Sequence, residues 1–269
     1  IGMPRLAGTD RAHIFRAVRP EAPGREALKG TTMQLTTAAT RTVGELVAER
    51  PSRARVFEQV GIDYCCGGRL SLEAACRKKG LDPARVLADL AAAEAPEPQE
   101  RVWTQATLTE LADHIEQSHH AFLRQELPRL SALTQKVSKV HGRTHPELLE
   151  VARLFEAFSS DMVSHMNKEE GILFPMIRAL EARGPMPAGV PGSVGRPIAM
   201  MVHEHDVAGR MLEQLRELTG GFIPPEGACG SYRAMLDGLA SIEADTHRHV
   251  HKENSILFPG AERLEAAPR

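Results

Sequence analysis

Apolar residues recur three and four positions apart along most of the chain, the spacing that places them on one face of an α-helix. The alternation of β-branched and polar residues that is typical of strands is nearly absent, and only 4% of the residues are aromatic. Thr107 and Glu110 have the spacing of a capping box, which marks the start of one long helical segment. We therefore predict an all-α protein.

The longest helical patterns lie in residues 104–269 and form four segments. Stretches rich in Gly and Pro at 184–197 and 220–230 are expected to be loops, and Pro128 is expected to kink the first segment. From His120 to the turn, and from the turn back to His165, the two helical segments have similar lengths. The same holds for the two segments between His205 and His249. These near-equal lengths predict an up-down-up-down four-helix bundle with the histidines at similar depth.

Four shorter helical segments precede the bundle, in residues 40–92. Thr42 and Glu45 form a second candidate capping box, Gly61 and Gly80 are placed to end helices, and Pro83 is placed to start one. We expect a small helical domain here. Residues 1–39 are expected to form a flexible extension, and the Pro-bearing residues 93–103 a linker between the domains.

Composition narrows the possible functions and locations. The formal net charge of −2 over 269 residues argues against a nucleic-acid surface. No apolar run approaches the roughly 20 residues that a membrane span needs. The four cysteines do not form the pattern of a disulfide framework, which favours a reducing, cytoplasmic location.

One motif occurs twice in the bundle region. The segment 165–175 reads HMNKEEGILFP, and 249–259 reads HVHKENSILFP, with His, Lys, Glu, Ile, Leu, Phe and Pro at matching positions. A second pair, His120 and His205, is separated by almost the same interval as His165 and His249. The bundle therefore contains two copies of one unit, each with a single His on one helix and a His-x-x-x-Glu pair on the next.

Residues four apart share a helix face, so each copy directs an imidazole and a carboxylate to the same side. A single His or His-x-x-x-Glu pair is usually a core or solvated residue, but the repetition favours metal ligands. The predicted ligands are His120, His165, Glu169, His205, His249 and Glu253. Nitrogen and oxygen ligands without thiolate favour iron, manganese or zinc. Six ligands for two ions leave positions free for a bridging oxo or hydroxo group and for an exogenous ligand.

The remaining histidines are interpreted as structural or surface residues. His119 would replace His120 only if the helical register were shifted by one, and His247 and His251 lie on a different face from His249. Glu204 and Asp206 flank His205 and are expected to orient it by hydrogen bonding. The two Ile-Leu-Phe-Pro tails are expected to pack in the core and to kink or end their helices.

These motifs resemble the bacterial RIC proteins (repair of iron centres), whose bundle domain is hemerythrin-like. The resemblance rests on the segments around the ligands, 120–124, 164–175, 204–209 and 249–259, and on 42–68, which is similar to the short N-terminal domain of that family. It implies two non-haem iron ions held by the six residues, with Glu169 and Glu253 as bridging carboxylates. It also implies repair of iron–sulfur clusters damaged by nitrosative or oxidative stress. Four histidines instead of the five of oxygen-carrying hemerythrins point away from oxygen carriage.

Cys65 and Cys66 are adjacent and precede Gly67 and Gly68, which allow a sharp turn. We expect this turn to leave both thiols accessible and a nearby helix N-terminus to lower their pKa. Under this hypothesis the pair acts in redox chemistry, passes on iron or docks a client protein. The alternative is a pair that is buried or inert.

Three functions remain open at this point. The protein donates iron to damaged clusters in iron–sulfur client proteins, or it is a di-iron redox enzyme acting on nitric oxide or peroxide, or it senses a small ligand such as nitric oxide or oxygen. The first is preferred because of the Cys65–Cys66 domain. The sequence leaves open whether the protein is a monomer or a homodimer.

Overall fold

The computed structural model describes residues 40–92, 101–184, 186 and 189–267. Every regular element within these ranges is a helix, apart from one isolated bridge between Thr42 and Ser71, so the predicted all-α class is confirmed. The predicted extension at 1–39 and residues 93–100 of the predicted linker lie outside the described residues.

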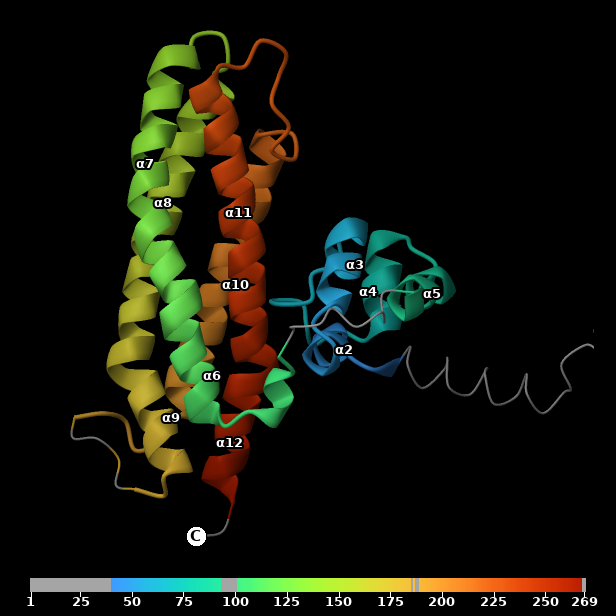
Figure 1. Ribbon diagram of the computed structural model, residues 1–269, viewed down its shortest axis with the longest axis vertical. Helices are drawn as coiled ribbons and strands as arrows, with labels where there is room; N and C mark the ends of the chain where they lie inside the picture. The colour runs from blue at the N-terminus through green and yellow to red at the C-terminus, as the bar shows by residue number, and fades with distance from the viewer. Residues whose placement is uncertain (1–39, 93–100, 185, 187–188, 268–269) are drawn as a thin grey trace, which may run out of the picture.

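A small helical unit forms the first part of the described chain (Figure 1). Its helices are α2 (Val43–Glu49), α3 (Arg53–Val60), α4 (Leu72–Lys79) and α5 (Pro83–Ala92). Thr42 and Glu45 form the expected capping box, and Gly61 and Gly80 end α3 and α4 with φ of 68°, in the left-handed region that favours glycine. The unit has its own apolar core, centred on Phe57 and Leu72.

The rest of the described chain forms four antiparallel arms, the predicted bundle (Figure 1). A short 3₁₀ turn, η1 (Trp103–Gln105), precedes it. The first arm is α6 (Leu108–His114), η2 (Ile115–His120) and α7 (Ala121–His141), and the second is α8 (Glu147–Lys168), η3 (Glu169–Leu173) and α9 (Phe174–Glu181). The third is α10 (Gly195–Leu218), and the fourth is α11 (Gly230–Lys252), η4 (Glu253–Leu257) and α12 (Phe258–Ala266).

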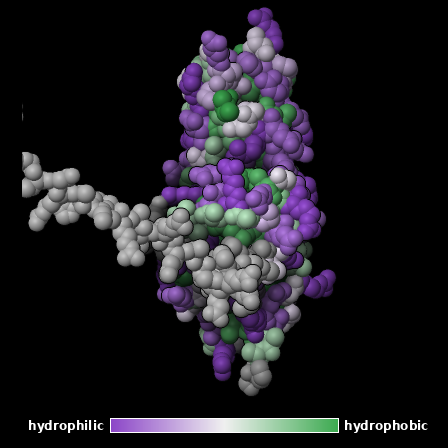
Figure 2. Space-filling view, turned by 90° about the vertical axis from the view of Figure 1, so that its right-hand side faces the viewer, coloured by the Kyte–Doolittle hydropathy of each residue, from purple (hydrophilic) through white to green (hydrophobic). Residues whose placement is uncertain are grey.

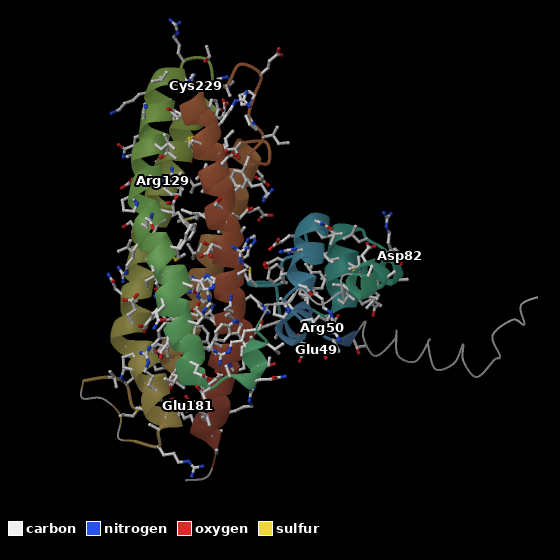
Figure 3. The ribbon with its side chains drawn as sticks, in the orientation of Figure 1. Glu49, Arg50, Asp82, Arg129, Glu181 and Cys229 are labelled. Carbon is white, nitrogen blue, oxygen red and sulfur yellow. The ribbon has the colours of Figure 1, made fainter. Side chains whose placement is uncertain are left out.

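Two apolar layers fill the bundle. One contains Leu130, Phe155 and Leu239, and the other contains Ile115, Phe174 and Phe258. On every arm the predicted ligands lie between residues of the first layer and residues of the second. The bundle core is therefore apolar at both ends and polar in between, and side chains crowd this polar level in Figure 3, between Arg129 and Glu181.

The helices continue through the positions where kinks or stops were expected. Pro128 lies inside α7, which runs on to His141. The Ile-Leu-Phe-Pro tails do not end their helices; the chain widens into the π-helical turns η3 and η4 and then continues as α9 and α12. In both turns the N–H of the Phe donates to the carbonyl of the Glu five residues before it. Each π turn thus begins at a predicted ligand, Glu169 or Glu253.

The small unit packs against the bundle. Ala48 of α2 belongs to the second apolar layer, and the ring of Tyr64 meets that of His251 edge-on, with centroids 5.5 Å apart. A Cβ added at Gly44 would lie 2.6 Å from Ser255 Oγ and 2.9 Å from the backbone oxygen of Gly68, so the close approach of α2 to these two segments depends on glycine.

Hydrophilic residues cover most of the face shown in Figure 2, and apolar residues appear there as separate spots. Among the described helices, none is both long and apolar enough to cross a membrane.

Candidate metal centre

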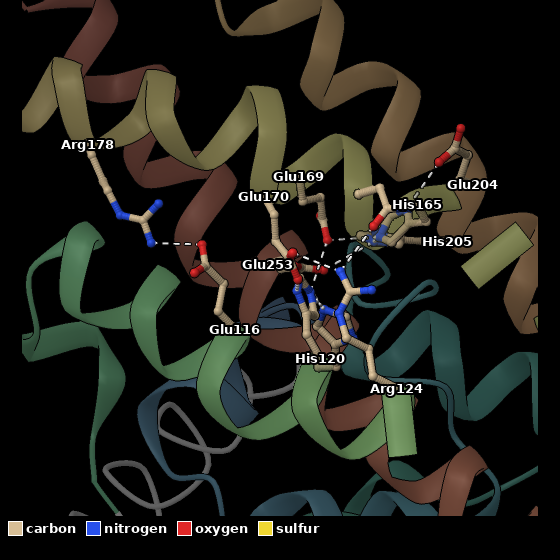
Figure 4. A network of polar contacts seen from close by, with 12 residues as sticks. Glu116, His120, Arg124, His165, Glu169, Glu170, Arg178, Glu204, His205 and Glu253 are labelled. Atoms are coloured by element: carbon tan, nitrogen blue, oxygen red, sulfur yellow. Dashed lines mark hydrogen bonds and ion pairs between the residues drawn. The ribbon is translucent and has the colours of Figure 1, made fainter. Parts of the chain in front are cut away.

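The six predicted ligands meet in the polar layer, and each of them is at most 2% exposed. Figure 4 shows His120, His165, Glu169, His205 and Glu253 at this level. They form two groups of four with ligand atoms within 4.8 Å of one another. The first group is His120, His249, Glu169 and Glu253, and the second is His165, His205, Glu169 and Glu253. Both carboxylates belong to both groups.

Each group combines the two repeats. The single His of one repeat pairs with the His of the His-x-x-x-Glu motif in the other: the Nε2 atoms of His120 and His249 are 3.2 Å apart, and those of His165 and His205 are 3.1 Å apart. This crossed pairing was not predicted, because sequence spacing does not say which arms are neighbours at the centre.

The carboxylates are placed between the groups. Glu169 Oε2 lies 3.3 Å from His120 Nε2 and 3.2 Å from His165 Nε2. Glu253 directs one oxygen to each group, with Oε1 3.1 Å from His249 Nε2 and Oε2 3.2 Å from His205 Nε2. Each carboxylate therefore contacts one imidazole of each group.

This arrangement fits a pair of bound cations. Two ligand atoms about 2.1 Å from one ion and about 90° apart lie about 3.0 Å from each other, close to the observed separations. Both oxygens of Glu169 and Oε2 of Glu253 are buried without a hydrogen bond of normal geometry. A buried carboxylate oxygen without a hydrogen bond is costly, and a cation at each group would satisfy these atoms. The buried His and Glu groups fit non-haem iron binding.

Hydrogen bonds on the outer side orient three of the imidazoles. Nδ1 of His120 donates to Glu170 (2.8 Å), Nδ1 of His165 to Glu204 (3.0 Å), and Nδ1 of His205 to the side-chain oxygen of Asn254 (3.0 Å). A hydrogen on Nδ1 leaves the Nε2 lone pair directed to the centre, as metal ligation requires.

The prediction that Glu204 orients His205 is wrong, because Glu204 bonds His165 on the neighbouring arm and Asn254 bonds His205. Glu170 and Asn254 were missed. They occupy equivalent positions in the repeated segments 165–175 and 249–259. The repeat could therefore have indicated a shared role for both residues.

The charges of the centre shift its pKa values in the protein without bound ions. Burial alone would lower the pKa of His165, but Glu169 and Glu204 raise it to about 10. Burial raises the pKa of Glu253, while His249 and His205 together hold it well below its usual range. The hydrogen bond from His165, helped by Lys168, lowers the pKa of Glu204 to about 2. The carboxylates are thus ionised at neutral pH, as metal ligands must be.

Comparisons with known proteins agree with this geometry. The profile of the hemerythrin HHE cation binding domain matches residues 111–261, and that of a domain of unknown function (DUF542) matches residues 39–94. The iron-sulfur cluster repair protein YtfE of Musicola paradisiaca is 38% identical over 84% of this chain and 98% of its own length. Proteins of the same name from Pectobacterium atrosepticum and Edwardsiella ictaluri are 36% and 39% identical, over 84% and 82% of this chain and 98% and 96% of theirs.

The chain belongs to the RIC family. The family resemblance drawn from the motifs is therefore confirmed.

In this RIC-family chain, the histidines next to the predicted ligands have other contacts. Nδ1 of His119 donates to Asp245 (2.9 Å), and its Nε2 accepts from Lys252 (2.9 Å). The structure thus places His120, and not His119, in the ligand cluster. His251 is buried, but it faces Tyr64 instead of the cluster.

The Cys65–Cys66 turn of this RIC-family chain lies against the bundle beside His205. The thiol of Cys66 donates to the backbone oxygen of His205 (3.3 Å). The side-chain amide of Asn254 donates to the backbone oxygen of Cys65 (3.5 Å). A Cβ added at Gly209 would lie 3.1 Å from Cys66 Sγ. The glycine therefore leaves room for the Cys66 thiol to approach α10 closely.

The expectation of two accessible thiols with lowered pKa is wrong for Cys65. Its side chain is buried, and it donates to Asp63 (3.1 Å). The contact with Cys66, followed by burial and the charge of Asp63, raises the pKa of the Cys65 thiol. Cys66 is partly exposed. The pair is therefore neither freely accessible nor remote from the centre.

A cavity of about 240 Å³ reaches the centre on the side of His165 and His205. Lys168, Glu204 and Met211 are among the residues that line it. A molecule the size of a few waters could approach the His165–His205 group from this side.

Proposed function

We propose that the polar layer binds two iron ions, one in each group of four ligands. His120 and His249 hold one ion, His165 and His205 hold the other, and Glu169 and Glu253 bridge them. The observation that carries this assignment is the convergence of four Nε2 atoms and two shared carboxylates in a buried layer. Two irons bound in this way, with a bridging oxo or hydroxo group, would supply redox-active metal with positions left for another ligand.

We further propose that the protein repairs damaged iron–sulfur clusters and supplies iron to them. The relatives that cover most of the chain carry the name iron–sulfur cluster repair protein. Damaged iron–sulfur proteins are then the partners, and the cytoplasmic location belongs to the same proposal. The proposal treats iron as the transferred substrate.

The position of Cys65 and Cys66 supports a role in that transfer. The two sulfur atoms are 3.9 Å apart, and Cys66 contacts the backbone of the predicted ligand His205. Thiolates are strong ligands for iron, and the raised pKa of Cys65 keeps it protonated until a metal or a client displaces the proton. The pair is a candidate intermediate holder of iron between the bundle and the client.

The deciding experiment follows labelled iron. The protein is loaded anaerobically with ⁵⁷Fe and mixed with a [4Fe–4S] dehydratase damaged by nitric oxide. We expect dehydratase activity to return, with ⁵⁷Fe in its cluster by Mössbauer spectroscopy. Recovery without ⁵⁷Fe in the cluster would contradict iron donation.

A Cys65→Ser/Cys66→Ser double variant tests the route. It should keep its iron but restore dehydratase activity several-fold more slowly. Recovery at the rate of the unchanged protein would exclude the thiol pair from the transfer.

A second candidate function is reduction of nitric oxide or peroxide at the centre, which the cavity beside His165 and His205 favours. Such an enzyme would turn over many times and retain its iron, whereas a donor loses iron in proportion to the clusters it repairs. Counting the iron that remains after repeated additions of nitric oxide or peroxide separates the two.

A further inference from the structure

The two metal-binding groups differ outside their ligands, although the repeat makes the ligands themselves equivalent. His165 corresponds to His249 and Lys168 to Lys252, at equivalent positions of the two repeated segments. Glu204, the residue before His205, corresponds to His119, the residue before His120. A carboxylate in one half is therefore replaced by an imidazole in the other.

The carboxylate at position 204 has a definite task. Glu204 accepts the hydrogen of His165 Nδ1 (3.0 Å) and forms an ion pair with Lys168. A carboxylate on the outer nitrogen fixes the imidazole for ligation through Nε2 and makes that nitrogen a stronger donor to a cation.

His249 has no such support from the residues that the structure describes. Its Nδ1 is buried and makes no hydrogen bond with any of them. His119, at the matching position, stacks parallel to His249 with centroids 5.4 Å apart. Both nitrogens of His119 are already in use, since Nδ1 donates to Asp245 and Nε2 accepts from Lys252. His119 therefore cannot accept the hydrogen of His249 Nδ1.

Asp245, one helical turn before His249, does not fill the gap. Its Oδ1 accepts from His119, and its Oδ2 is buried without a hydrogen bond to the described part of the chain. The guanidinium of Arg248 lies 3.7 Å from the same oxygen, Asp245 Oδ1. The contact with His119 thus holds Asp245 in an orientation that leaves His249 unsupported.

The other two imidazoles do not reverse this difference. His120 is supported by Glu170, which also pairs with Arg124, and His205 is supported by Asn254. Among the described residues, the His165–His205 group therefore has an outer hydrogen bond on both imidazoles, and the His120–His249 group has one on His120 alone.

The missing hydrogen bond at His249 Nδ1 matters when a metal binds. A cation on His249 Nε2 requires the ring hydrogen on Nδ1, where no described residue accepts it. Without the cation the hydrogen can move to Nε2 and be donated to Glu253 Oε1, 3.1 Å away. The empty state of this group is therefore favoured over its bound state, relative to the group that contains His165.

We propose that the two ions are held unequally, that the His120–His249 group releases its ion first, and that His119 is the positioning residue that sets this order. The inference rests on the proposed binding of two irons. It identifies the ion of the His120–His249 group as the one that is released first.

The test measures iron release from the full chain, loaded anaerobically with two Fe²⁺, into excess ferrous chelator. We expect two phases of equal amplitude. Glu204→Gln removes the carboxylate from His165 and should speed the slow phase by about 10–100-fold, the usual effect of losing such a partner. His119→Glu supplies the repeat-matched carboxylate beside Lys252 and should slow the fast phase. Glu213→Gln, an exposed position on the same helix as Glu204, is the control and should change neither phase.

The order in which labelled and unlabelled iron leave the unchanged protein is a second readout, and it does not depend on how a variant folds. One equivalent of ⁵⁷Fe²⁺ added to the metal-free protein, followed by one of unlabelled Fe²⁺, labels the tighter group, and chelation should then remove unlabelled iron first. Circular dichroism confirms that each variant is folded. Release of both irons in a single phase, or slowing of neither phase by His119→Glu, would overturn the inference. Failure to bind two irons at all would instead overturn the proposed function.

Discussion

The apolar layer around Phe155 and the ligand layer around Glu169 are equally buried, but they differ in what stabilises them. Phe155 and its neighbours Leu130 and Leu239 exclude water and need no partner from outside the chain. Glu169 and Glu253 are fully buried anions, which cost free energy unless cations or hydrogen bonds satisfy them. One layer holds the bundle together, and the other is arranged for an ion that the chain does not itself provide.

Removing a predicted ligand should have the largest effect, because it changes the ligand layer and leaves the apolar layer intact. His165→Ala or Glu253→Ala should reduce bound iron from two ions to one or none, with loss of any coupled Mössbauer signature, because Glu253 belongs to both groups. Elemental analysis with Mössbauer spectroscopy on anaerobic protein checks this. Two irons retained by Glu253→Ala would mean that the layer is not the binding site.

A change in the apolar layer should act on stability alone. Phe155→Ala leaves a cavity in the core and should lower the free energy of unfolding by about 3–5 kcal/mol, with and without iron. Urea unfolding of both forms measures it. A loss seen only in the iron-loaded form would show that the two layers are not independent.

A change in the ligand layer should depend on iron. Glu169→Gln removes the buried anion that pairs with protonated His165, so the metal-free protein should lose some stability, and the iron-loaded form should lose more stability together with affinity. Thermal unfolding of the two forms separates these effects. Equal destabilisation of both forms would contradict a layer that is built for a cation.

The smallest expected effect concerns pH. Since the pKa of His165 is raised from about 6.5 to about 10, its contribution to the stability of the metal-free protein is fully present below about pH 6.5 and is lost as pH rises towards 10. The melting temperature of the metal-free protein should therefore fall over this interval. An iron-bound imidazole has no such proton to lose, so the loaded protein should fall less. Parallel curves for the two forms would contradict the assignment.

The sequence was sufficient for the fold and for the six residues that meet at the centre, because both follow from periodicity and repetition. It was not sufficient for the crossed pairing of His120 with His249, which depends on which arms are adjacent. It also assigned Glu204 to the nearest His in sequence, whereas helix packing brings it to His165. The contact of Cys66 with the backbone of His205 depends on docking of the small unit onto α10, which no local pattern encodes.

The crossed pairing has a consequence for how the protein is made. Neither half of the bundle can surround an ion alone, since each group takes one imidazole from each repeat and Glu253 contributes to both. During synthesis on the ribosome, the first two arms would emerge with only part of each coordination sphere. If the layer binds two ions as proposed, both coordination groups are complete only after the fourth arm has been translated and folded.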